Sequence, residues 1–201
     1  MITTPLMRTI PLFRLGLGIA GMAALTGIAA ACDDPLGLLP AQSENMIDTV
    51  VLSALTGTPV TEPSGFYLVY KVVARTDRGN ETFDFAVDID ESGAVEVFPT
   101  GALGLSALSA VIKPEDTFEN ITEAPVEGFI SDSAISLNLN EVFVVRSQAV
   151  REYCPLYIGA LPRYGKFRVM EVDSTTRKIT LEFLVNANCG YRSLEVGIPT
   201  Q

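Results

Sequence analysis

Three cysteines are the residues of this chain whose type and spacing point most directly to chemistry. Two of them, Cys154 and Cys189, stand 35 residues apart. Such a pair forms a disulfide in an oxidising compartment, whereas a metal site would need ligands beyond two thiolates. The chain contains no histidine to supply them. The sequence therefore predicts a Cys154–Cys189 disulfide and no metal site.

The third cysteine, Cys32, follows a segment with the features of an export signal. Residues 1–31 carry Arg8 and Arg14 but no acidic residue, and an apolar run ends in small residues before Cys32. This order is typical of a secretory signal peptide, and with the cysteine it resembles a bacterial lipoprotein signal. Lipid on Cys32 would leave an even pair of thiols in the exported protein. We therefore expect a membrane anchor at Cys32 and a location in the bacterial cell envelope, in the periplasm or at the cell surface.

Two other interpretations of residues 1–31 remain open. A transmembrane helix needs about 20 apolar residues, and this run is shorter and is interrupted by glycines. Plain secretion is the second, because Ala29 and Ala31 satisfy the small-x-small cleavage rule, and Ala29 stands where lipoprotein signals usually carry leucine. The cysteine count favours the lipid anchor over both.

The absence of histidine removes many kinds of catalytic site. It excludes Ser-His-Asp and Cys-His nucleophile systems, an imidazole general base, and histidine-bound zinc or haem. Serine with lysine, or two carboxylates, could still form a catalytic pair, but no motif selects particular residues. The stretch Asp88–Gly93 resembles the first half of a calcium loop, although Pro99 stands where such a loop has its glutamate, and a hairpin turn explains the same residues. We expect no enzyme activity, no cofactor and no metal.

Charge is distributed unevenly along the chain. After residue 31 there are 12 Lys and Arg against 24 Asp and Glu, so the net charge is −12, which excludes nucleic acid and anionic lipid head groups as electrostatic partners. From Glu141 onward, however, eight basic residues stand against six acidic ones. The basic residues that could form a positive area are Arg151, Arg163, Lys166, Arg168 and Arg192. If they were neighbours in space, Arg151, Arg163 and Arg192 could bind an anionic ligand or partner; a solvated surface is the other interpretation.

Alternation of apolar and polar residues predicts β-strands with one face in the core and one in water. The alternating segments are 82–90, 135–140 and 178–186, and three further segments, 66–75, 141–147 and 164–172, are apolar on more than one face. Met46–Leu55 fits either a helix or a strand. We predict an all-β fold, an antiparallel β-sandwich, with a small closed β-barrel as the alternative.

The predicted parts follow one another in a simple order. Residues 1–31 form the signal peptide, residues 32–47 the lipidated cysteine with a flexible tether, and residues 48–201 a single β domain.

Two resemblances to known families bear on these expectations. The segments ALTGTP (54–59), FDFAVD (83–88), AP with GF (124–129) and NCGYRSL (188–194) resemble those of uncharacterised exported lipoproteins of environmental bacteria. This resemblance implies export and a lipid anchor and brings no activity with it. More faintly, segments 142–147, 164–169 and 179–183 are similar to the C-terminal strands of haem-binding HmuY-type lipoproteins. That family uses histidine or methionine as haem ligands, and the mature chain offers Met46 and Met170.

Two functions are compatible with these observations. The first is a lipid-anchored, non-catalytic β-domain that binds a partner protein or another envelope component through loops on a rigid scaffold. The alternative is a carrier or scavenger of a small ligand, which would need a concave, largely apolar site.

Overall fold

The computed structural model describes residues 37–77, 82–106 and 108–199, and within them the chain forms ten β-strands and two short 3-10 helices. The strands are β1 (Ile47–Ser53), β2 (Gly65–Tyr67), β3 (Val72–Ala74), β4 (Phe85–Ile89), β5 (Val95–Pro99), β6 (Ala110–Ile112), β7 (Ile135–Leu137), β8 (Val142–Arg146), β9 (Tyr164–Asp173) and β10 (Lys178–Asn186). The 3-10 helices are η1 (Thr100–Leu103) and η2 (Arg151–Tyr153). All of them lie in the compact unit Leu38–Gln201. No helix among these described residues has the length and apolar character needed to cross a membrane.

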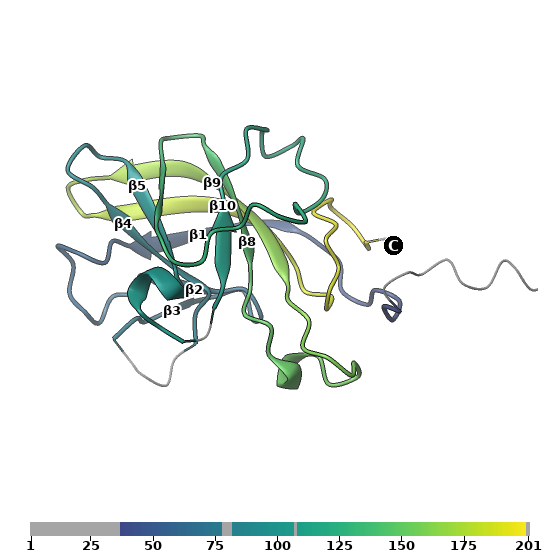
Figure 1. Ribbon diagram of the computed structural model, residues 1–201. Helices are drawn as coiled ribbons and strands as arrows, with labels where there is room; N and C mark the ends of the chain where they lie inside the picture. The colour runs from purple at the N-terminus through teal and green to yellow at the C-terminus, as the bar shows by residue number, and fades with distance from the viewer. Residues whose placement is uncertain (1–36, 78–81, 107, 200–201) are drawn as a thin grey trace, which may run out of the picture. The chain divides into compact units, whose positions relative to one another are not determined.

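Two five-stranded antiparallel sheets form the domain (Figure 1). The first sheet has the strand order β1-β10-β9-β8-β6, and the second has the order β3-β2-β4-β5-β7. The two sheets are not closed into a barrel over the residues described here. The prediction of an antiparallel β-sandwich is therefore confirmed.

Aromatic side chains fill the space between the two sheets. Phe66 and Phe85 of the second sheet meet Phe143, Phe167 and Phe183 of the first, with ring centroids 4.9 to 5.4 Å apart. All five are at most 4% exposed. Aromatic pairs at these separations contribute about 0.5–1.5 kcal/mol each beyond their burial. The apolar residues of the alternating segments therefore form the core, as their spacing predicts.

The outer face of the first sheet is also covered. Val144 of β8, Tyr164 of β9 and Leu184 of β10 point away from the central core and pack against Phe118 and Leu194, which lie in the loops before β7 and after β10. This second apolar cluster explains why β8 and β9 are apolar on both faces. It also means that two long loops are fixed against the sheet.

Two segments differ from what their patterns suggest. Met46–Leu55, which fits a helix or a strand, contains β1, because Ile47–Ser53 pairs with Leu184–Lys178 along its whole length. The predicted water-facing side of segment 82–90 is buried: Asp84 is 0% exposed and Asp88 is 8% exposed. That expectation is wrong because side chains and loops from outside the sheet cover this face, and they supply hydrogen bonds to both carboxylates.

Candidate functional site

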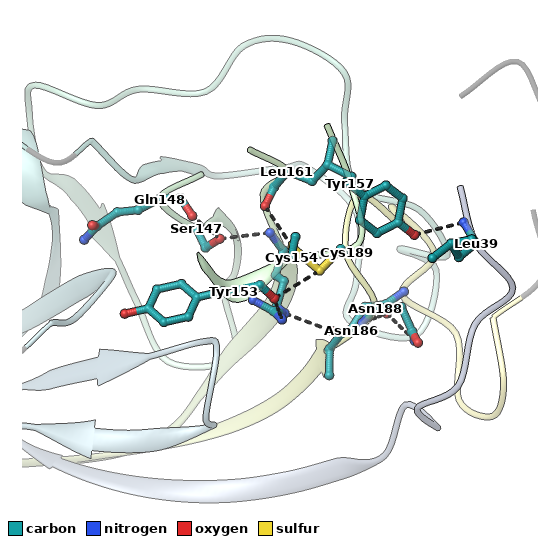
Figure 2. The surroundings of a disulfide bond; sticks show 12 residues. Leu39, Ser147, Gln148, Tyr153, Cys154, Tyr157, Leu161, Asn186, Asn188 and Cys189 are labelled. Atoms are coloured by element: carbon teal, nitrogen blue, oxygen red, sulfur yellow. Dashed lines mark hydrogen bonds between the residues drawn. A yellow bond between two sulfur atoms is a disulfide. The ribbon is translucent and has the colours of Figure 1, made fainter. Parts of the chain in front are cut away.

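Cys154 and Cys189 are joined by a disulfide, which confirms the predicted pairing (Figure 2). Their Cα atoms lie 6.0 Å apart. The bond connects the loop after η2 to the segment that follows β10, so it fixes one end of the sandwich. Cys32 lies outside the described residues, and its lipidation remains a prediction.

The loop that begins at Cys154 carries the most exposed apolar side chains of the described chain. We call residues 154–162 the stapled loop. Leu156 is 77% exposed and Ile158 is 98% exposed, more than any other large apolar side chain that the structure describes. The loop contains no charged residue. Exposed apolar side chains at the tip of a fixed loop are typical of contact surfaces.

The beginning of the domain is hydrogen-bonded at this same end (Figure 2). The backbone N–H of Leu39 donates to the Tyr157 hydroxyl (2.9 Å), and the Tyr191 hydroxyl donates to the Leu39 carbonyl (3.0 Å). The amide oxygen of Asn188 accepts a hydrogen bond from the backbone N–H of Ser43 (3.0 Å). From Leu39 onward, the segment predicted as a tether therefore belongs to the folded domain.

The structure places the three predicted binding arginines in different surroundings. Arg163 donates to the carbonyls of Tyr153 (2.9 Å) and Ala187 (2.8 Å), so it holds η2 against the end of β10. Arg192 donates to the carbonyl of Ala124 and so fixes the covering loop before β7. Arg151 is exposed at the start of η2. Two of the three guanidinium groups thus bind the protein's own backbone.

The two remaining basic residues of the predicted positive area lie together on β9. The Lys166 ammonium donates to the carbonyls of Phe118 (2.6 Å) and Ile121 (2.9 Å), and burial lowers the pKa of Lys166. Arg168 forms ion pairs with Glu119 (2.7 Å) and Glu182. Their charges are therefore compensated by carbonyls and carboxylates, and no continuous positive area of all five residues forms.

A small pocket opens beside Lys166 on the outer face of the first sheet. Its volume is about 270 Å³, just below the usual range of about 300–1,000 Å³ for ligand sites. Its apolar lining consists of Ile47, Phe118, Leu194 and Val196, and its polar lining of Glu119, Thr122, Lys166, Arg168, Glu182 and Glu195. This Lys166 pocket combines apolar walls with a larger number of polar and charged groups.

A larger hollow lies at the opposite end of the sandwich. We call it the far-end hollow; its volume is about 500 Å³, and it is lined by Ser92, Gly93, Ala94, Asn138, Leu139, Met170, Glu171 and Val172. The stapled loop leads into β9 at its first residue (Figure 1), whereas the residues that line the hollow include Met170, Glu171 and Val172 near the end of that strand. At about 3.3 Å per residue, the part of β9 from Tyr164 to Met170 separates the two by roughly 20 Å. Leu139 and Met170 are 54% and 41% exposed, so apolar groups are accessible there.

Asp84 is a buried carboxylate that sequence reasoning missed. Its two oxygens accept hydrogen bonds from the backbone N–H groups of Leu68 (2.8 Å) and Gln148 (2.9 Å). Burial raises the pKa of Asp84 to about 6, although these N–H groups and nearby Arg163 act in the opposite direction. No sequence signal separates Asp84 from Asp88 and Asp90, the other carboxylates of the same alternating pattern.

Neither the predicted calcium alternative nor a methionine-ligated haem finds a ligand set in the described residues. Asp90 accepts hydrogen bonds from Ser92 and Ala94 within the hairpin turn, and Asp88 pairs with Arg177 at 2.7 Å. Groups of three or more acidic or cysteine side chains able to hold a metal ion do not occur in the part of the chain described. Met46 precedes β1 at the level of the start of β9, whereas Met170 lies near the other end of β9.

We compared the chain with family models, with curated proteins and with solved structures, and none of them matches it.

Proposed function

We propose that the protein is an exported lipoprotein, anchored by lipid on Cys32 to a membrane of the bacterial cell envelope, whose β-sandwich binds an envelope partner protein without catalysing a reaction. The observation that carries this proposal is the Cys154–Cys189 disulfide. Intracellular thiols are kept reduced, so a structural disulfide supports export. The pairing also leaves Cys32, behind its apolar segment, as the single cysteine for lipid attachment.

The far-end hollow is the surface we propose for the partner. It offers exposed Leu139 and Met170 between polar groups, which is the mixed composition of a protein contact surface. The three arginines fit this role less well, because Arg163 and Arg192 donate to backbone carbonyls of their own chain. A partner contact by exposed Arg151 stays a prediction.

The anchor is tested by metabolic labelling with a fatty-acid probe in the native host. We expect label on the wild-type protein and none on Cys32→Ser, with the variant moving from the membrane fraction to the soluble fraction. The Cys154–Cys189 disulfide should persist in Cys32→Ser, because it does not involve that residue. Equal labelling of both proteins would refute the anchor.

The partner surface is tested by crosslinked pull-down from envelope extracts. The double variant Leu139→Ser, Met170→Ser should lose the captured partner, whereas Val126→Ser, which changes a 73% exposed side chain elsewhere, should retain it. The variant Arg151→Ala in the same assay tests the arginine prediction. Undiminished capture by the double variant would reject the far-end hollow as the binding surface.

A small-ligand role is the second candidate, and the Lys166 pocket is the observation that favours it. Native mass spectrometry of the protein purified from its host would reveal a retained small molecule. Loss of that mass in Phe118→Ala would assign it to this pocket.

A further inference from the structure

We propose that the stapled loop is a membrane-contacting element: Leu156 and Ile158 enter the head-group boundary of the bilayer that holds the lipid on Cys32. This inference rests on the lipid anchor proposed above. It adds an orientation of the domain on the membrane, with the disulfide end facing the lipid and the far-end hollow facing away.

The side chains of the loop suit a lipid boundary. Ile158 and Leu156 are 98% and 77% exposed and therefore lack an apolar environment in the isolated domain. The residues between Glu152 and Arg163 carry no charge, so no ionic group would have to leave water when the loop tip enters the bilayer. Interfacial elements of this kind bury their apolar side chains about 5–10 Å deep, at the boundary between head groups and acyl chains.

The attachment of the chain brings this loop close to the membrane. Leu39 is hydrogen-bonded to Tyr157, which lies between the two exposed apolar residues. Cys32 precedes Leu39 by seven residues, and a fully extended chain of that length spans at most about 25 Å. A lipid on Cys32 therefore keeps the stapled loop within that distance of the bilayer. The far-end hollow is separated from the loop by the additional length of β9.

The loop is also held in a fixed position. The Cys154–Cys189 bond ties its first residue to the segment after β10, and Arg163, directly after the loop, donates to the carbonyl of Tyr153 just before it. Fixing the loop in the folded protein reduces the conformational entropy that would be lost on contact with the membrane. The disulfide would thus serve the orientation of the domain as well as its stability.

Local charge permits the contact although the domain is acidic. The stapled loop contains no acidic residue, and Arg163 directly after it donates to backbone carbonyls of its own chain. Exposed Arg151 stands at the base of the loop, where a guanidinium group can meet lipid phosphate. The loop itself therefore brings no negative charge to anionic head groups.

Tryptophan fluorescence tests the proposal directly, because the chain contains no natural tryptophan. Full-length lipidated Ile158→Trp is reconstituted into vesicles of phosphatidylethanolamine and phosphatidylglycerol, with or without brominated acyl chains. We expect its emission to shift to shorter wavelength and to lose intensity in the brominated vesicles, as for an indole at the acyl boundary. The matched control is Val60→Trp, at a 72% exposed position in the turn between β1 and β2, which should show neither effect.

The outcomes separate this proposal from the anchor. If the lipidated variant floats with the vesicles but its emission matches that of the control, the membrane contact is wrong and the anchor stands. A wavelength shift without quenching by bromine would mean that protein, such as a second copy of the chain, covers the loop, and this also overturns the proposal. If mass spectrometry finds no lipid on Cys32 and the protein does not float, the anchor itself is wrong and the orientation is rejected with it.

Discussion

At the scale of single residues, Asp84 should make stability depend on pH in the opposite sense to most carboxylates. Burial raises its pKa from 3.8 to about 6, so between these values the folded protein binds more protons at Asp84 than the unfolded chain does. The stability that Asp84 contributes is complete below about pH 4 and is lost as the pH rises through 6. At about 1.4 kcal/mol per pKa unit, the loss amounts to roughly 3 kcal/mol.

Carboxyl ¹³C NMR measures this titration directly. We expect a signal with a midpoint near pH 6 that is absent from Asp84→Asn. Asp173 is the internal control, because hydrogen bonds from the hydroxyl and backbone N–H of Thr176 lower its pKa. A midpoint for Asp84 below its ordinary value would contradict the predicted effect of burial.

At the scale of elements, the disulfide should contribute substantially to stability. It closes a chain segment of 35 residues that contains β9 and β10, the two longest strands described. Removing such a bond costs about 2–5 kcal/mol, so Cys154→Ala, Cys189→Ala should lower the free energy of unfolding by this amount. Urea unfolding of the double variant is the measurement. Reducing agent should destabilise the wild type equally and leave the variant unchanged; a variant as stable as the wild type would show that the bond is not structural.

The turn formed by η1 depends on close packing at Gly101. A Cβ atom there would overlap the backbone carbonyl oxygen of Ser131, whereas a Cβ at Gly159 would meet nothing within 4 Å. Gly101→Ala should therefore destabilise the domain by about 1–3 kcal/mol, and Gly159→Ala should change its stability by less than about 0.5 kcal/mol. Thermal unfolding of the two variants gives the comparison. Equal effects would mean that the Gly101 contact relaxes without cost.

The alternation of apolar and polar residues predicts the positions of the strands well, but it predicts poorly the turns between them and which strand face is buried. The alternation at 178–186 corresponds to β10, and the apolar run at 164–172 corresponds to β9, because side-chain period reports strand geometry directly. The run at 66–75 is interrupted between β2 and β3, where Lys71 has a φ of 55°. Neither glycine nor asparagine, the residues that usually adopt a positive φ, occurs in this run, so the sequence does not predict the turn. Which face is buried depends on distant segments, so the burial of Asp84 by Gln148 could not be predicted.

In the candidate site, too, features that depend on residue type could be predicted, whereas contacts between residues distant in the sequence could not. The Cys154–Cys189 disulfide could be predicted from the sequence, because the number of cysteines and the expected export to an oxidising compartment are enough to identify the pair. The roles of Arg163 and Arg192 could not, because their carbonyl partners at Ala187 and Ala124 come together only in the folded chain. The contact between Leu39 and Tyr157, which underlies the proposed orientation, joins residues 118 positions apart.

At the scale of the whole molecule, the centre of the first sheet should open differently from the edge of the second. β9 is paired on both sides and lies within the chain segment that the disulfide closes, whereas β3 is an edge strand of three residues, with Val72 and Val73 47% and 42% exposed. Amides of β9 should therefore exchange with solvent only through global unfolding, and those of β3 through local opening. Native-state hydrogen exchange before and after reduction measures both. Reduction should lower the opening free energy of β9 by the same 2–5 kcal/mol, approximately, that the disulfide contributes, and leave β3 unchanged. An equal loss at β3 would show that the sandwich opens as one unit, and an unchanged β9 would show that the disulfide end is not part of its global stability.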